Sequence, residues 1–497
     1  MRFTSIAVRA LQAALTALFL WLVAARRIPL GVRGEWEWLR ISVPPSYAQA
    51  IIAAVAIAAY ATFAAWGRFA LDKRHGAFRE TIWTFLLALA AIAVQWSVIE
   101  GSPYGYGLSR WGIALGNAGS SGYYRVARGE IEDPARFLAD YPKWIQKQDE
   151  LHIGTHPPGL LIINHLIGEM MDRNPAIARF TLTNAPRSAL DGLAAIDRGR
   201  SRFSKADRAA LVFLGALTLL LSALTVIPLY ALGRLSTNSA ATAWTAASLW
   251  PLVPSAILFQ PIADTTYPFI ASFLLLLAVC ATTGGKRRAL AFAAAAGITI
   301  AGGMILTLAF LPIGLIAAIV VVAGRSNRLQ VDRGGNLARL GGAIAIAVGF
   351  LTAVSAWRVF THADLFTIWR NNLINHARFY INYHRTYSRW VWVDGIEFAI
   401  ALGISTSILA ILAATAPRRI PAVGWGTIAT LIALDVSGRN LGEIARLWLP
   451  FMPPLLIVAA VGSERIGGRS RDLATTIALV GLQTLCLEQL IQTIYPV

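Results

Sequence analysis

Charged residues are scarce in this sequence. Only 14% of its 497 residues are Asp, Glu, Lys or Arg, whereas about 25% is usual for a soluble protein. Hydrophobic residues make up 56%, and the mean hydropathy is +0.57. This balance excludes one or several water-soluble domains, and the 16 Trp and 21 Phe exclude a disordered chain. The apolar residues form runs long enough to cross lipid, so the sequence predicts a polytopic integral membrane protein.

Acidic residues and cysteines are also few. The sequence has 26 acidic and 44 basic residues, which gives a formal charge of +18. Most arginines lie between apolar runs, so we interpret the excess as a determinant of orientation and of contact with anionic membrane lipids. We expect no nucleic acid as a partner. Cys280 and Cys486 lie inside apolar runs, so we expect no structural disulfide.

The lengths of the apolar runs predict about thirteen transmembrane helices in a single integral membrane domain, residues 1–497. An all-α fold satisfies every backbone group in lipid, and this many helices argue against a barrel. The first run exceeds the core of a signal peptide and no clear cleavage site follows, so we expect a retained helix. The predicted spans are 4–25, 48–69, 80–99, 209–232, 240–258, 265–283, 288–303, 304–323, 339–357, 396–416, 421–437, 448–464 and 473–493.

Short basic loops predict the side of the membrane on which each connection lies. Clusters such as Lys286–Arg288 mark cytoplasmic loops. Alternation of the helices then places 100–208 and 358–395 on the outer face as two large loops, with 438–447 on the same side. The apolar stretch 158–171 has only about 14 residues, short for a span, and we expect it half-inserted or at the interface. Six of the seven histidines fall in or beside the two large loops: His152, His156, His165, His362, His376 and His384.

The segment Gln148–Gly159 (QDELHIGTHPPG) is the most informative one. Its two prolines exclude a helix before them and suit the first turn after them, so we expect Asp149, Glu150, His152 and His156 at the membrane surface. A group that acts on a lipid-linked headgroup must lie there. We predict Glu150 as a general base, with Asp149 as the alternative. The spacings Asp-x-x-His and His-x-x-x-His also suit a divalent metal, and a turn with exposed charges is the simpler interpretation.

Two further segments carry polar residues at the outer ends of predicted helices. Asp264 either caps the helix that starts near Thr265 or orients an acceptor or a metal. Glu443 and Arg446 lie at i and i+3, with Arg439 about one turn earlier. They form either a salt bridge at the start of a helix or a phosphate site in which Glu443 orients Arg446.

The segment 371–397 mixes arginines, among them Arg389, with several Phe, Tyr and Trp. One interpretation is an amphipathic surface helix with an aromatic belt. The other is a flap over an active site, in which aromatic rings contact sugar faces and the arginines stabilise a leaving phosphate.

Together these segments resemble the GT-C superfamily of polytopic glycosyltransferases, nearest to its dolichyl-phosphate-mannose-type and aminoarabinose-transferase-like members. The features in common are a large outer loop with the Tyr-Tyr stretch SGYYRVA, then HPPG, then FQPIADTTYPF and RNLGEIARLWLPFMPP. The residues expected to bind substrate are His152, His156, Arg389, Arg439, Glu443 and Arg446, and those expected to be catalytic are Glu150, Asp149 and Asp264.

One departure from the family concerns the catalytic base. Members of the family usually carry an acidic residue just before the Tyr-containing helix. Here that stretch reads GNAGSSGYYRVA, and Asn117 and Ser120 occupy the expected region. Either the base comes from elsewhere, from Glu150, Asp149 or Glu100, or catalysis relies on another group, or the chain is inactive.

The resemblance implies an inverting glycosyltransferase in the plasma or inner membrane, with its active site on the outer face. It moves a sugar from a polyprenyl-phosphate donor to a glycan, lipid or protein acceptor. A transporter or flippase of a lipid-linked or anionic solute needs ionisable groups near mid-membrane and broken helices, whereas the charges here cluster at helix ends. The missing early carboxylate keeps a non-catalytic membrane scaffold as a third interpretation.

Overall fold

The computed structural model is almost entirely helical, which confirms the predicted all-α class. Helices account for 78% of it, and its four strands have two residues each. Eight helices of the described chain are long and apolar enough to cross a membrane, or nine if one bent pair counts as a single span. This is the architecture of a helical membrane protein. The structure describes residues 5–72, 76–117, 119–148, 150–196, 203–323 and 333–493.

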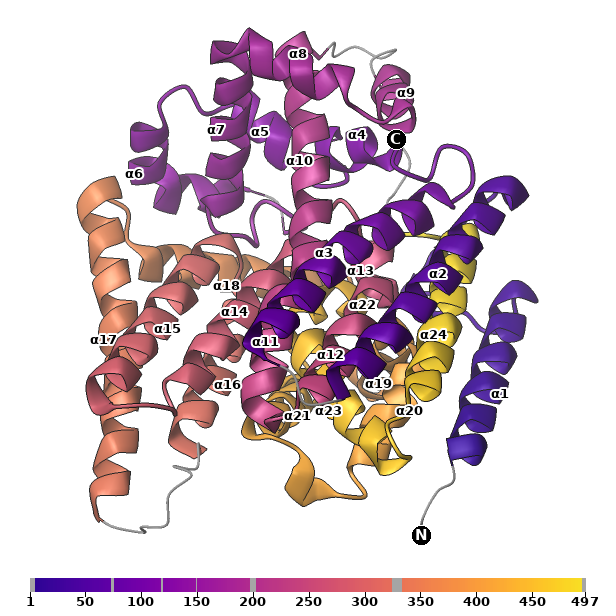
Figure 1. The fold of residues 1–497 in the computed structure, drawn as a ribbon. Helices are drawn as coiled ribbons and strands as arrows, with labels where there is room; N and C mark the ends of the chain where they lie inside the picture. The colour runs from indigo at the N-terminus through magenta and orange to yellow at the C-terminus, as the bar shows by residue number, and fades with distance from the viewer. Residues whose placement is uncertain are drawn as a thin grey trace.

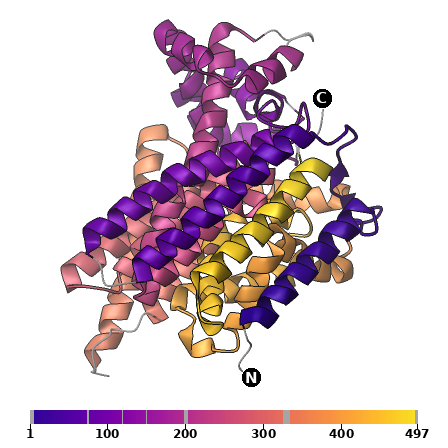
Figure 2. The same cartoon turned by 45° about the vertical axis from the view of Figure 1, so that its right-hand side comes forward.

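The eight long helices form the body of the bundle (Figure 1). Helix α1 packs along α24 and α20, and α2 lies between α24 and α3 (Figure 2). These spans are α1 Ser5–Ala24, α2 Tyr47–Asp72, α3 Ala77–Glu100, α10 with α11 Lys205–Thr237, η3 with α14 Ala263–Cys280, α15 Lys286–Leu306, the Arg339–Thr361 part of α17 (Arg333–Thr361), and α24 Ser470–Leu490.

Five of the thirteen predicted spans are shorter or broken helices, so a count of thirteen is not confirmed. Prolines break 240–258, because Pro251 and Pro254 cannot donate a backbone N–H to a continuous helix. Gly403, at a φ of 99°, bends α19 against α20 by 108°. The elements concerned are α12 Ala240–Leu249, η2 Trp250–Leu252, α13 Pro254–Leu258, α16 Phe310–Ala323, α19 Tyr387–Leu402, α20 Ile404–Ala413, η4 Pro417–Arg419, α21 Ala422–Ser437, α22 Ile444–Leu447, η5 Leu449–Phe451 and α23 Met452–Arg465.

The predicted first outer loop folds as a lobe of short helices at one end of the bundle (Figure 1). Arg128 fixes this lobe to α10, because its guanidinium lies 2.7 Å from Asp172 and 2.9 Å from Asp207. The hydroxyl of Tyr124 donates to Asp207 at 2.8 Å. The lobe contains α4 Arg110–Gly116, α5 Tyr123–Gly129, α6 Pro134–Trp144, η1 Ile145–Lys147, α7 Gly159–Arg173, α8 Pro175–Thr183 and α9 Arg187–Ile196.

Two asparagines of α18 (Leu365–Asn382) hold the segment that carries the HPPG motif. The Nδ2 of Asn372 donates to the carbonyls of Gly154 and His156, both at 3.0 Å. The Nδ2 of Asn375 donates to Gly154 at 2.9 Å. The two predicted outer loops are therefore in direct contact, and a helix of one loop fixes the backbone of the other.

The segment between α1 and α2 pairs with the chain that follows α24. Strand β1 (Gly31–Val32) pairs with β2 (Trp36–Glu37), and β3 (Leu39–Arg40) pairs with β4 (Ile491–Gln492). The segment between α1 and α2 is thus a small hairpin that is joined to the end of α24. Both cysteines are free, as predicted.

Candidate functional site

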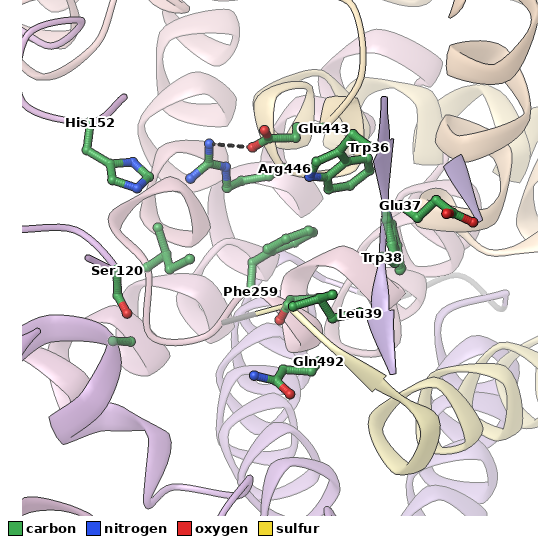
Figure 3. Close-up of a pocket in the computed structure, with 13 residues that line it drawn as sticks. Trp36, Glu37, Trp38, Leu39, Ser120, His152, Phe259, Glu443, Arg446 and Gln492 are labelled. Carbon is green, nitrogen blue, oxygen red and sulfur yellow. Dashed lines mark hydrogen bonds and ion pairs between the residues drawn. The ribbon is translucent and has the colours of Figure 1, made fainter. Parts of the chain in front are cut away.

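A cavity lies where the lobe, the hairpin and the segment before α23 meet (Figure 3). One end is polar, because Arg446, Glu443 and His152 lie together there. The rest of the wall is largely apolar and aromatic. The lining residues are Trp36, Glu37, Trp38, Leu39, Ala114, Ser120, His152, Phe259, Ile262, Glu443, Arg446, Gln492 and Thr493.

Arg446 is the cation of the polar end. It lies on the single turn α22, and its Nη2 is 3.0 Å from Oε2 of Glu443. Burial lowers the pKa of Arg446, but the charges of Glu443 and Asp264 outweigh this effect and raise the pKa above its ordinary value. The guanidinium therefore stays charged at any working pH, with carboxylates from two distant segments close to it.

His152 and His156 lie beside Arg446 and are neutral. Burial, with the nearby charges of Arg446 and His156, lowers the pKa of His152 to about 3. Burial also lowers the pKa of His156, although Asp264 opposes the shift. The Nδ1 of His156 lies 2.8 Å from the carbonyl of His152. A carbonyl can only accept, so Nδ1 carries the proton and Nε2 of His156 is left as an acceptor.

Asp264 belongs to the same electrostatic cluster. It lies in the short helix η3 (Ala263–Thr266), half-buried, and its charge acts on both His156 and Arg446. The N-cap residue of η3 is Ile262 and that of α14 is Thr266, so the N-cap interpretation of Asp264 is wrong. Within the described part of the chain, no hydrogen bond or ion pair is found for its carboxylate, and Asp264 lies behind the cavity rather than among its lining residues.

Sequence motifs far apart thus converge, but not every predicted residue takes part. Glu150 accepts a hydrogen bond from Asn382 at 3.3 Å and does not line the cavity. Arg389 is 63% exposed and lies 3.6 Å from Glu35. Asp149 lies outside the described residues.

The remaining predicted residues lie at the margin of the site. Glu100 accepts a hydrogen bond from Ser188 of α9, so it joins α3 to the lobe. Arg439 is exposed and does not line the cavity. Burial lowers the pKa of His376 on α18, and the charges of His156 and Arg439 lower it further. Among the described residues, no group of three His, Cys, Asp or Glu side chains could hold a metal ion.

Sequence reasoning missed the aromatic wall of the cavity. Trp36 and Trp38 come from the hairpin, and Trp38 meets Phe259 edge to face with ring centroids 6.3 Å apart. The signal was present in the run GEWEWLR, since alternation puts residues i and i+2 on one face of a strand. Tyr123 was quoted only as part of a motif, yet its ring packs edge-on against His156 at 5.7 Å.

Glu35 fixes the hairpin to the corner between α18 and α19. Its carboxylate accepts from the backbone N–H and the hydroxyl of Thr386, at 2.8 and 2.6 Å, and from Nε1 of Trp390 at 2.7 Å. Burial raises the pKa of Glu35, but these hydrogen bonds and the charge of Arg389 lower it overall. The wall that carries Trp36 is therefore held in place by one carboxylate.

We expect Glu35→Ala to destabilise the folded protein by about 1–3 kcal/mol, because several hydrogen bonds to one charged group are lost. Thermal unfolding followed by tryptophan fluorescence measures the loss. Glu37→Ala is the matched control on the same hairpin and should change stability by less than about 0.5 kcal/mol. Equal effects of the two changes would contradict the anchoring role of Glu35.

The buried neutral histidines predict a loss of stability in acid. An unfolded histidine binds a proton near pH 6.5, whereas folded His152 does so only near pH 3. Between these values the unfolded state binds more protons, so stability falls as the pH is lowered. His152→Gln should reduce the slope between pH 4 and 6 by up to about 1.4 kcal/mol per pH unit. Unfolding at a series of pH values in detergent measures it, and identical slopes for both proteins would refute the assignment.

Comparisons of the chain found no matching family model, no matching curated protein and no matching solved structure. The site must therefore be interpreted by its own chemistry. It combines a half-buried cation, two neutral histidines, a nearby carboxylate and an aromatic wall, all at the junction of the bundle and the lobe. Such a site suits an amphipathic ligand that carries an anionic group.

Proposed function

We propose that this chain is a polytopic, GT-C-like membrane glycosyltransferase. It moves a sugar from a polyprenyl-phosphate carrier to an acceptor on the non-cytoplasmic face, and the proposal includes the thirteen-span topology. One observation carries it: Arg446 and His152 line one end of a cavity whose other wall is aromatic. Asp264 and His156, from distant segments, lie behind this end, near enough for charge interactions with Arg446.

The two ends of the cavity suit the two parts of such a donor. A guanidinium offers a planar set of donors that matches phosphate oxygens, and the half-buried guanidinium of Arg446 lines the cavity. The wall formed by Trp36, Leu39 and Phe259 offers apolar surface to the first isoprene units or to the faces of a sugar ring.

In the proposed reaction, Asp264 is the general base. It removes the proton of the acceptor hydroxyl while that oxygen attacks the anomeric carbon of the donor sugar. The bond between this carbon and the phosphate oxygen breaks, and Arg446 neutralises the charge that forms on the departing polyprenyl phosphate. A single displacement inverts the anomeric configuration.

A transporter of a lipid-linked solute is the second candidate, and one observation favours it. Asp394 and Glu397 are buried, with exposures of 0% and 6%, on α19, which meets α20 at a bend of 108°. Buried ionisable groups and bent helices are frequent in transporters. The polar residues of the cavity lie instead on loops and short helices, which suits chemistry at a surface.

The decisive experiment gives the purified protein a series of polyprenyl-phosphate sugars and an acceptor hydroxyl in lipid nanodiscs. We expect release of polyprenyl phosphate with formation of a product of inverted configuration. The same protein in sealed vesicles is tested for movement of the lipid-linked sugar between leaflets. Movement without transfer to any acceptor would favour the transporter and reject the transferase.

A further inference from the structure

The loop that presents Arg446 has a strained backbone. Gly442 and Glu443 are both in the left-handed region, with φ of 78° and 58°. Glycine adopts this conformation freely, but Glu443 has a side chain and does so only at a cost in free energy. The strain falls on the residues that immediately precede α22, so the conformation at Glu443 decides where Arg446 points.

Three side chains hold the N–H groups of this loop, those of Asp394 and Glu397 buried and that of Tyr380 half-buried. The hydroxyl of Tyr380 accepts from Leu441 at 2.8 Å. Asp394 accepts from Gly442 at 3.0 Å. Glu397 accepts from Ala445, the neighbour of Arg446, at 3.2 Å.

The indole ring of Trp390 also supports the loop before α22. Trp390 packs over Gly442, so that a Cβ there would lie 3.0 Å from the indole. The same Trp390 donates to Glu35 at 2.7 Å, which links the support of this loop to the hairpin. One helix, α19, thus bears on two walls of the cavity.

The buried carboxyl groups of Asp394 and Glu397 on α19 are not explained by a contribution to the stability of the fold. Oδ2 of Asp394 is buried without a hydrogen-bond partner in the described part of the chain, and the second oxygen of Glu397 is buried beside the indole N–H of Trp38. Burying carboxyl groups destabilises a fold. An apolar residue at either position would avoid this cost, so the contacts with Gly442 and Ala445, and that of Glu397 with Trp38, are the positive roles that these carboxyls have.

We propose that Tyr380, Asp394 and Glu397 are positioning residues that hold Glu443 in its left-handed conformation and thereby aim Arg446 into the cavity. The inference rests on the proposed function only in naming the ligand of Arg446 as the phosphate of a polyprenyl phosphate. We call the support of residues 441–445 by Tyr380, Asp394 and Glu397 the clamp. Its effect on the backbone can be measured without any ligand.

The test compares an amide with an apolar residue at position 397. Glu397→Gln keeps an oxygen that can accept from Ala445, whereas Glu397→Leu keeps the approximate volume and removes the acceptor. We expect Glu397→Gln to bind a short-chain polyprenyl phosphate within about 3-fold of the unchanged protein, and Glu397→Leu to bind it at least about 10-fold more weakly.

Hydrogen exchange reports on the clamp even if no lipid phosphate binds. The amides of Leu441–Ala445 should exchange at least about 10-fold faster in Glu397→Leu than in Glu397→Gln, with the surrounding helices unchanged. Glu464→Leu is the matched control, because Glu464 pairs with Arg68 at 2.8 Å, far from the cavity. It should leave both the exchange of 441–445 and the binding of the lipid unaffected.

Two results would overturn the clamp. One is slow exchange of 441–445 in Glu397→Leu, and the other is an equal loss with glutamine and with leucine, which would assign the role to the charge of Glu397. The results distinguish a failure of the clamp hypothesis from a failure of the proposed glycosyltransferase function. Fast exchange in Glu397→Leu with no sugar transfer by the unchanged protein supports the clamp and rejects the transferase, and transfer with slow exchange does the opposite.

Discussion

Arg446→Ala is expected to abolish detectable binding of a polyprenyl-phosphate donor and to reduce transfer at least about 100-fold. The change removes the cation of the polar end and leaves the carboxylates of Glu443 and Asp264 without it. Two effects therefore add, namely the lost contact with phosphate and the repulsion between phosphate and carboxylates. Binding of radiolabelled polyprenyl phosphate and initial rates of sugar transfer measure them separately.

Two matched variants show whether the guanidinium itself is needed. Arg446→Lys keeps the charge but not the planar set of donors, so we expect it to recover only part of the lost activity. Arg439→Ala removes an exposed arginine of the same segment and should leave binding within about 2-fold, because exposed charges contribute little. If Arg446→Ala bound the donor with normal affinity, the proposal that the donor phosphate lies at this end of the cavity would be rejected.

Asp264→Asn should lower the rate of transfer by about 10²–10⁴-fold, which is the usual contribution of a general base. Asparagine keeps the shape of the side chain but cannot take up a proton. Donor affinity should change little, because Arg446 remains in place. The measurement is a single-turnover rate at saturating donor, which separates the chemical step from binding.

Glu150→Gln and Glu100→Gln are the controls for Asp264→Asn. Glu150 bonds to Asn382, and Glu100 bonds to Ser188, so neither carboxylate is free to serve the cavity. We expect both variants to keep at least about half of the normal rate, since a surface or structural contact is all that changes. An inactive Glu150→Gln beside an active Asp264→Asn would return the role of base to Glu150.

Local chemistry explains which parts of the fold the sequence could predict. An apolar run such as 80–99 has one stable form in lipid, a helix, and α3 follows it closely. The runs 240–258 and 396–416 are also largely apolar but are broken or bent. Their ends are decided by Pro251 and Pro254, and by the packing that lets Gly403 turn the chain.

The polar end of the site was visible in the sequence for a similar reason. His152, Asp264 and Arg446 are polar residues at the ends of apolar runs, where water or a ligand must satisfy them. Such positions are few in a chain with 14% charged residues. The choice among carboxylates could not be made in this way, because Glu150 and Asp264 have equivalent local surroundings in the sequence.

The sequence alone determined the all-α class, the approximate positions of the eight long apolar spans and the residue types of the polar end, because these follow from local hydrophobicity and from charge. Only the tertiary structure decided that Asp264 rather than Glu150 lies with Arg446, that Trp36 and Trp38 form a wall, and that α19 holds the loop before α22. These are contacts between residues far apart in the chain. They depend on how the helices pack and how loops of fixed length close, and no local pattern encodes that geometry.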